Sequence, residues 1–243
     1  MSYEKYLRGE KGIKFIQKDR FNRDIGSYNN GLNDKNSIAG NDLIITIDSE
    51  LQEYGELLMS NKKGAIVAIE PSTGELLSLV SAPSYNPNLL VGRERSKNYF
   101  ELYKDSIYKP LIDKGLLSTF PAGSPFKVIV GLIALQENVI NDKNTILCGG
   151  EYIYGRNKKS MKCHCGGGYR NIYNAISESC NSYFADAYRK TISKDNNISK
   201  NFDMWSEGVK SFGLGNYLNN DLPIGKKGMI PTSEFYDRWY PDF

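Results

Sequence analysis

Two apolar runs joined by a four-residue turn constrain the fold of this chain more than any other sequence feature. The runs cover residues 64–70 and 75–81 and are rich in β-branched side chains, and the turn between them, residues 71–74, contains proline and glycine. This pattern predicts an antiparallel β-hairpin. Because the two strands are joined directly, the unit disfavours a sheet that is built from alternating strands and helices.

The remaining periodic segments predict helices that surround this hairpin. Residues 43–47 read as a strand, and Asp48 can cap a helix that follows it. Further helices are expected after Ser124 and over residues 172–178 and 182–190. The predicted apolar positions are Leu51, Tyr54, Leu57 and Leu58 in the first helix and Tyr183, Phe184, Ala187 and Tyr188 in the last. This order predicts an α+β fold, with an antiparallel sheet packed against helices.

The bulk composition is that of an ordinary globular protein of 243 residues. Its hydrophobic content is 40% and its charged content is 24%, with 31 basic and 28 acidic residues. No basic run is interleaved with aromatic residues in the way a nucleic-acid groove requires, so a nucleic-acid partner is not expected. No apolar stretch reaches the roughly 20 residues of a membrane helix. The chain as given is expected to be soluble, with any anchor or export signal outside it.

Ser124 and Lys127 are the candidate nucleophile and its base. Four pairs fit the pattern Ser-x-x-Lys, and the others are Ser2–Lys5, Ser60–Lys63 and Ser106–Lys109. Only Ser124 follows a Pro/Gly turn and opens an apolar helix, where Ser124 can cap the helix and Pro125 suits its first position. A lysine one helical turn from a serine lies on the same face and can take its proton if the amine is neutral.

All four cysteines and the only histidine lie between residues 148 and 180. They are Cys148, Cys163, His164, Cys165 and Cys180, and glycines flank the central pair. Such a set suits tetrahedral zinc, in which four thiolates suffice and His164 could replace one of them. One or two disulfide bonds, or free buried thiols, are the alternatives.

Several segments together resemble a known family. Residues 64–80, 83–88 and 120–127 resemble the transpeptidase domain of class B penicillin-binding proteins, and residues 19–23 and 88–92 narrow the resemblance to penicillin-binding protein 2. It runs from about residue 5 to the C-terminus. The resemblance implies the penicillin-recognising serine transpeptidase fold, with residues 1–42 as a linker or the end of a preceding pedestal domain and residues 43–243 as the N-terminal portion of the transpeptidase domain.

The resemblance also implies roles for four residues. Ser124 would attack the penultimate D-Ala of a peptidoglycan stem peptide, with Lys127 as its base. The family's second motif, Ser-x-Asn, fits five triplets here, but only Ser179-Cys180-Asn181 lies between two predicted helices at the family's distance from the nucleophile. Ser179 would relay a proton between Lys127 and the leaving group, and Asn181 would hold the substrate amide.

The family's third motif, Lys-Ser/Thr-Gly on a strand, is not found. Lys226-Lys227-Gly228 is the nearest match, but its neighbours resemble a family segment upstream of that strand. Because the missing strand supplies an oxyanion-hole donor, this stretch alone is expected to be weakly active or inactive. The rival interpretation is a non-catalytic penicillin-binding or sensor-like module. A carboxypeptidase or β-lactamase is disfavoured by the hairpin and by residues 84–92.

The partners and location that the resemblance implies are those of cell-wall synthesis. We expect stem peptides ending in D-Ala-D-Ala, β-lactam antibiotics, a SEDS glycosyltransferase and the rod-complex scaffold as partners. The expected location is the periplasmic side of the bacterial inner membrane. No cofactor is expected for catalysis. Some members of the family hold zinc in this region, which favours a structural zinc on the four cysteines, where it would support Ser179 and Asn181.

Overall fold

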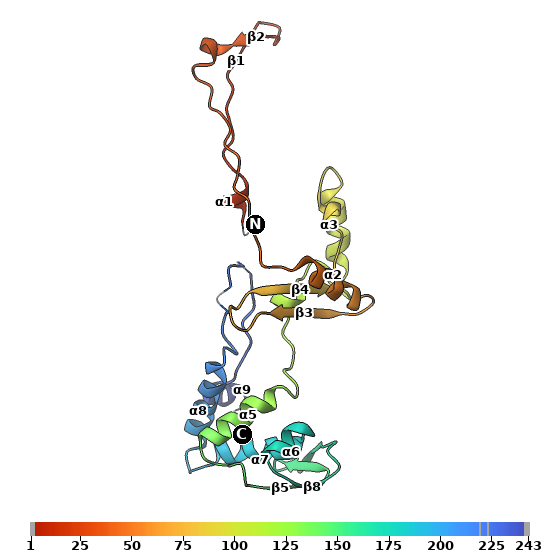
Figure 1. Ribbon diagram of the computed structural model, residues 1–243, viewed down its shortest axis with the longest axis vertical. Coiled ribbons are helices and arrows are strands. Elements are labelled where there is room, and N and C mark those ends of the chain that lie inside the picture. Colours follow the sequence, from red (N-terminus) through yellow and green to blue (C-terminus); the bar gives the residue numbers. More distant parts are fainter. Residues whose placement is uncertain (1–2, 219, 223, 241–243) are drawn as a thin grey trace. The chain divides into compact units, whose positions relative to one another are not determined.

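A computed structural model describes residues 3–218, 220–222 and 224–240 (Figure 1). The chain divides into two compact units. Unit 1 comprises Met1–Ser118 with Asn220–Gly225, and unit 2 comprises Thr119–Asn219 with Lys226–Phe243. Helices accompany antiparallel two-stranded sheets in both units, which confirms the predicted α+β class.

Unit 1 contains the predicted hairpin and a series of short helices. Its elements in chain order are α1 (Glu4–Leu7), β1 (Ile16–Lys18), β2 (Asp24–Ser27), α2 (Ser49–Leu58), β3 (Gly64–Ile69), β4 (Leu76–Ala82), α3 (Arg95–Lys104) and α4 (Lys114–Leu117). Short 3-10 turns cover Tyr28–Gly31 and Pro87–Leu90. Strands β1 and β2 pair within an arm formed by the chain before residue 42, as the bridges Glu10–Ile38 and Ile13–Lys35 show.

The hairpin of β3 and β4 forms as predicted. The strands pair antiparallel from Gly64–Ala82 to Ile69–Leu76, with an irregularity at Ala68/Ile69. The turn closes through a hydrogen bond from the Gly74 N–H to the Glu70 carbonyl at 2.8 Å. Gly74 has a φ of +80°, which the absence of a Cβ makes inexpensive.

Helix α2, which precedes the hairpin, is capped as predicted, but it does not bury the predicted face. The Asp48 carboxylate accepts a hydrogen bond from the Leu51 N–H at 2.9 Å. Gln52 and Gly55 are the residues that face β4: Gln52 accepts from Ser78 Oγ, and a Cβ on Gly55 would lie 2.8 Å from Val80 Cγ2. The predicted apolar positions, Leu51, Tyr54, Leu57 and Leu58, are exposed.

The predicted strand over residues 43–47 was wrong, because this segment makes no strand ladder in the structure. It runs alongside β4 with a side-chain bond from Thr46 Oγ1 to the Leu76 carbonyl at 2.7 Å. A backbone bond from the Asp48 N–H to the Leu77 carbonyl follows. Ile44 is 96% exposed, so the apolar run that suggested a strand has no core to face.

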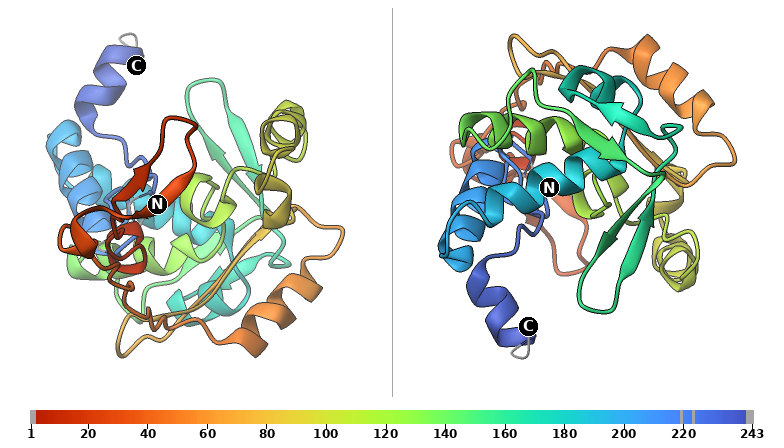
Figure 2. Two further views of the ribbon diagram at one scale, coloured as in Figure 1. Left: turned by 90° about the horizontal axis from the view of Figure 1, so that it is seen from above. Right: turned by 90° about the horizontal axis from the view of Figure 1, so that it is seen from below.

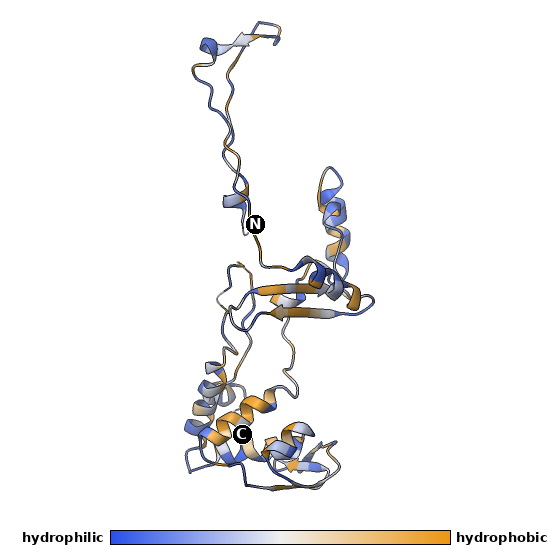
Figure 3. Ribbon diagram, in the orientation of Figure 1, coloured by the Kyte–Doolittle hydropathy of each residue, from blue (hydrophilic) through white to orange (hydrophobic). Residues whose placement is uncertain are grey.

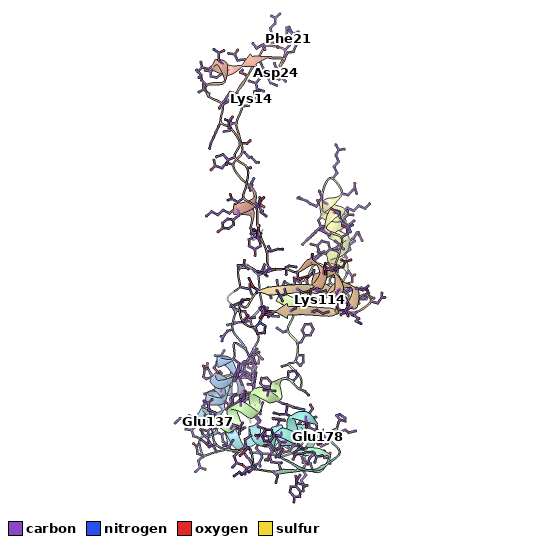
Figure 4. The ribbon with its side chains drawn as sticks, viewed as in Figure 1. Lys14, Phe21, Asp24, Lys114, Glu137 and Glu178 are labelled. Atoms are coloured by element: carbon purple, nitrogen blue, oxygen red, sulfur yellow. The ribbon has the colours of Figure 1, made fainter. Side chains whose placement is uncertain are left out.

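A buried lysine, the first residue of α4, holds the two ends of the segment between the hairpin and α4 together. Lys114 is 4% exposed, and its Nζ donates hydrogen bonds to the carbonyls of Pro83, Lys109 and Ile112 at 3.2–3.4 Å (Figure 4). Burial, and next the charge of Lys63, lower the pKa of Lys114. The excursion over residues 82–115 is therefore tied down at its base, and it contains α3, which the sequence did not predict.

Unit 2 is built on helices that pack around a single core. Its elements are α5 (Phe126–Gln136), β5 (Ile146–Cys148), β6 (Glu151–Tyr154), β7 (Lys159–Lys162), β8 (Gly168–Arg170), α6 (Ile172–Ser177), α7 (Asn181–Ile192), α8 (Ile198–Ser211) and α9 (Ser233–Trp239). Strand β5 pairs with β8. Strands β6 and β7 pair with each other and form a two-stranded ribbon (Figure 2).

The core of unit 2 lies among α5, α7 and α8. Helix α5 is apolar along its length (Figure 3), and Tyr183, Phe184 and Ala187 on α7 are buried against it as predicted, with Tyr188 partly buried. Trp205 on α8 packs edge-on against Phe126 and Tyr188. No helix among the described residues is long and apolar enough to cross a membrane.

Candidate active site

Ser124 and Lys127 lie at the start of α5, where the chain turns into the helix. Gly123 has a φ of +65°, and the first bonds of the turn run from the Phe126 N–H to the Gly123 carbonyl and from the Lys127 N–H to the Ser124 carbonyl. The expectation that Ser124 caps the helix was wrong. Pro125 occupies the N-cap position, and no side chain caps this end, which leaves the Ser124 hydroxyl for another partner.

That partner is Ser179, which links the serine to the lysine. Lys127 Nζ donates to Ser179 Oγ at 2.8 Å and to the Ser179 carbonyl at 2.6 Å, and Ser179 Oγ donates to Ser124 Oγ at 2.8 Å. The structure therefore joins three of the predicted residues in one hydrogen-bonded chain, and Lys127 reaches Ser124 through Ser179.

The backbone at Ser179 is held in an unusual conformation by the end of α6. The Ser179 N–H donates to the Ile176 carbonyl and the Cys180 N–H to the Ala175 carbonyl, which is the pair of bonds that defines a Schellman motif. Ser179 occupies the left-handed position of this motif, with a φ of +53°, where glycine is usually found. A serine is kept here at a conformational cost, and its hydroxyl lies between Lys127 and Ser124.

This cost gives a stability prediction for two substitutions that both remove the hydroxyl. We expect the full-length Ser179→Gly variant to be more stable than Ser179→Ala by about 1 kcal/mol, because glycine adopts a positive φ without a Cβ clash. For a domain of this size the difference corresponds to roughly 2–4 °C in melting temperature. Calorimetry of both variants tests it, and equal melting temperatures would contradict the assigned strain.

Asn181 is anchored by the strand that precedes the central cysteines. Its side-chain Nδ2 donates to the Lys162 carbonyl at 2.8 Å, and its backbone N–H donates to Cys163 Sγ at 3.1 Å. Asn181 is also the first residue of α7, whose N-cap is Cys180. Ser179 and Asn181 thus lie at a tight junction, in which residues 178–180 alone separate α6 from α7.

The four cysteines converge on one point beside this junction. The Sγ atoms of Cys148, Cys163, Cys165 and Cys180 all lie within 4.8 Å of one another, and none of the four cysteines is in a disulfide bond. His164 is exposed and is not part of this group. The cysteines come from β5, the β7–β8 loop and the start of α7, so the fold brings together a set that could hold a metal ion.

The thiols differ in how easily they ionise. Burial opposes ionisation of Cys163, but hydrogen bonds from the backbone of Ser182 and Cys165 outweigh it and lower the pKa of Cys163 to about 5. Burial raises the pKa of Cys165 and Cys180. A thiol that ionises readily is a starting point for binding a cation, whose charge favours ionisation of the neighbouring thiols.

A cavity that the sequence did not predict opens beside the nucleophile turn. Its volume is about 790 Å³, and Phe126, Trp205 and residues 119–123 and 226–231 line it. The two segments that line it are far apart in the chain, so no local sequence pattern predicts that they meet. Lys226-Lys227-Gly228 lies here in irregular backbone and not on a strand, consistent with the expectation that it is not the third motif.

In this α+β protein, one hydrogen-bonded chain joins a serine at the start of a helix, a lysine one turn further on and a second serine. Enzymes that form serine acyl-enzymes have this arrangement. Residues 64–240 match the family described as "Penicillin binding protein transpeptidase domain". The chain belongs to this family.

Individual relatives agree with the resemblance to penicillin-binding protein 2 and confirm it. Peptidoglycan D,D-transpeptidase MrdA of Escherichia coli K12 is 32% identical over 98% of this chain, and MrdA of Acinetobacter baumannii is 30% identical over 96%. The chain spans 36% and 33% of those two proteins.

Among solved structures, the complex between penicillin-binding protein PBP2 and MreC from Helicobacter pylori superposes with a TM-score of 0.77 and 28% identity over 99% of this chain and 42% of the other. Pseudomonas aeruginosa PBP2 in complex with WCK 5153 gives 0.71 and 32% identity, over 85% of this chain and 44% of that one.

Proposed function

We propose that the full-length protein is a peptidoglycan D,D-transpeptidase that cross-links stem peptides through an acyl-enzyme on Ser124 during cell elongation. The observation that carries the proposal is the hydrogen-bonded chain from Lys127 through Ser179 to Ser124. A serine hydroxyl is a poor nucleophile unless a base removes its proton, and this chain supplies both a base and a route for the proton.

The reaction follows from these contacts. Ser124 Oγ attacks the carbonyl carbon of the penultimate D-Ala, and its proton passes through Ser179 Oγ to Lys127 Nζ. The carbon–nitrogen bond to the terminal D-Ala then breaks, and the leaving amine takes the proton back along the same route. An amine of a neighbouring stem peptide attacks the resulting ester, gives up one proton and restores the Ser124 hydroxyl.

Asn181 and β-lactams fit the same scheme. The Asn181 side chain is fixed by the Lys162 carbonyl beside Ser179, so it is placed to hold the amide of the bound peptide. A β-lactam resembles D-Ala-D-Ala and would acylate the same serine. When the ring of a β-lactam opens, the leaving nitrogen stays attached to the acyl group and does not diffuse away as D-Ala does. The adduct therefore persists long enough to be measured.

We further propose that the four cysteines hold a structural zinc ion. Four sulfur donors that meet within 4.8 Å suit tetrahedral coordination with no open position, as in closed structural sites. Since Cys180 lies between Ser179 and Asn181, and Cys163 Sγ accepts the Asn181 N–H, a filled site would hold the second motif against the first. When bound, zinc would supply rigidity and not chemistry.

Removing two of the four thiols tests this proposal. We expect the purified full-length protein to contain about one zinc per chain and the Cys148→Ser, Cys165→Ser variant to contain none, because two thiolates are a poor zinc site. Its melting temperature should fall by several degrees, since ligand that binds only the folded state stabilises it. Replacing His164 by alanine is the control and should leave the zinc content unchanged. A metal-free wild type with two disulfide bonds would contradict the assignment.

The location and partners are proposed on the same basis. We propose that the protein acts on the periplasmic side of the inner membrane, together with a SEDS glycosyltransferase and the rod-complex scaffold. The likeness to the PBP2–MreC complex supports the second partner. We also propose that residues 1–42 end a preceding pedestal domain and that residues 43–243 begin the transpeptidase domain.

Mass spectrometry of the full-length protein with benzylpenicillin tests the function. We expect one covalent adduct per chain, and peptide mapping should place it on the peptide that contains Ser124. A second assay with stem peptides ending in D-Ala-D-Ala should release D-Ala and form cross-linked product. An adduct without any cross-linking would favour the rival, a penicillin-binding module without catalytic activity, and no adduct would contradict both.

A further inference from the structure

Arg170, at the end of β8, bonds to three separate points around the second motif. Its Nε donates to Glu178 Oε2 at 2.8 Å, its Nη2 to the Cys165 carbonyl at 2.7 Å and its Nη1 to the Tyr169 carbonyl at 3.0 Å. The side chain is only 16% exposed. A guanidinium that is largely removed from water and bonded to three acceptors fixes the groups that it contacts, because its planar fork allows little rearrangement.

The position of Glu178 makes this contact relevant to the site. Glu178, which is labelled in Figure 4, is the C-cap residue that follows α6, and the left-handed Ser179 comes directly after it. The two bonds that close the Schellman motif come from the N–H groups of Ser179 and Cys180. A side-chain bond that fixes Glu178 therefore restrains the turn whose unfavourable backbone conformation places the Ser179 hydroxyl.

We propose that Arg170 is a positioning residue that holds Ser179 between Lys127 and Ser124 by clamping Glu178 to the Cys165 loop. This inference rests on the proposed function, since it assigns a role in the acylation of Ser124. Arg170 touches none of the reacting groups and acts through Glu178. Its route to Ser179 is separate from the one through Cys163, which reaches Asn181 on the other side of Cys180.

The clamp differs from the ordinary ion pairs of this surface. Pairs such as Arg238–Glu234 join two exposed side chains within one helix and are expected to contribute little. The Arg170–Glu178 pair joins two different elements, and the same guanidinium also binds the Cys165 carbonyl. Loss of Arg170 would leave the Cys165 carbonyl and the Glu178 carboxylate without this donor.

The test uses the full-length protein with Arg170→Met, which keeps the aliphatic length of the side chain, and Arg170→Lys, which keeps its charge. Titration with a fluorescent penicillin gives the fraction of molecules that react. Labelling reactions that are quenched at successive times give the acylation rate constant of those molecules. We expect Arg170→Met to lower the rate constant about ten-fold with an unchanged reactive fraction, as loss of a charged hydrogen bond predicts. Arg170→Lys should recover part of the loss. Hydrogen exchange at the Ser179 and Cys180 amides should become faster.

A matched control is available at the end of another helix. Glu137 is the C-cap of α5 and pairs with Lys194, so Lys194→Met removes a similar partner from a similar position and should leave the rate constant unchanged. An Arg170→Met rate constant within two-fold of the wild type, or a smaller reactive fraction at an unchanged rate constant, would overturn the proposal. If the wild type is not acylated at all, the proposed function fails, and unchanged exchange at Ser179 would still decide against the clamp.

Discussion

Replacement of Ser124 by alanine is expected to abolish the covalent adduct of the full-length protein with benzylpenicillin. Alanine removes the only atom of this residue that can form an ester, while α5 keeps its start because the Ser124 side chain does not cap the helix. Removal of a catalytic serine lowers turnover by about 10⁶-fold in well-studied hydrolases, so no adduct should form within hours. Intact-mass measurement of wild type and variant decides the question.

The chain offers a control with the same local pattern. Ser106 also precedes a lysine by three residues, but it follows Asp105 at the end of α3 and not a turn into an apolar helix. Ser106→Ala should be acylated like the wild type. A normal adduct on the Ser124→Ala variant would show that another nucleophile reacts, and the roles of Lys127 and Ser179 would then have to be reassigned.

Replacement of Lys127 by methionine is expected to slow acylation by roughly 10³-fold without changing the site of the adduct. Methionine has a similar length but cannot take a proton, and positioned general bases contribute about 10²–10⁴ in rate. The lysine also donates to the Ser179 carbonyl, so its loss frees the strained turn as well as removing the base. The measurement is the acylation rate constant under excess penicillin, with peptide mapping of the slow product.

Lys63 provides the matching control, since it closes another Ser-x-x-Lys pair and its Nζ donates to the Ile107 carbonyl. Lys63→Met should not change the acylation rate constant. A Lys127→Met rate constant within ten-fold of the wild type would mean that a different group accepts the proton from Ser124. The two variants thus separate the residue that forms the bond from the residue that makes it reactive.

The sequence predicted the parts of the fold in which local chemistry and burial agree. The hairpin of β3 and β4 and helices α6 and α7 combine turn residues or caps with an apolar face that is buried. The prediction of a strand over residues 43–47 was wrong because this apolar run faces no core. Strands β5–β8 were not predicted because a Cys/Gly-rich stretch has weak strand preference, and β5 finds its partner β8 only on the far side of the β6–β7 ribbon.

The candidate site was predictable residue by residue but not in its connections. The turn and the apolar helix around them indicated Ser124 and Lys127, and the family resemblance indicated Ser179 and Asn181. The four cysteines, which are close in sequence, also meet in space. The left-handed backbone at Ser179 was not predictable, because serine rarely adopts it and only the end of α6 imposes it. The Arg170–Glu178 contact carried no signal either, since ion pairs across elements leave no periodicity.

The abrupt passage from α6 to α7 fixes the length of the chain at this point. One residue added between Ser177 and Asn181 would shift the residues that end α6 and begin α7 out of their positions, and the bonds that close one helix and cap the next would be lost. Residues 155–158, at the exposed tip of the β6–β7 ribbon, carry no such restriction. Affinity tags, fluorophores and cross-linkers for study of this protein therefore belong on that ribbon, where added length leaves the junction of α6 and α7 unchanged.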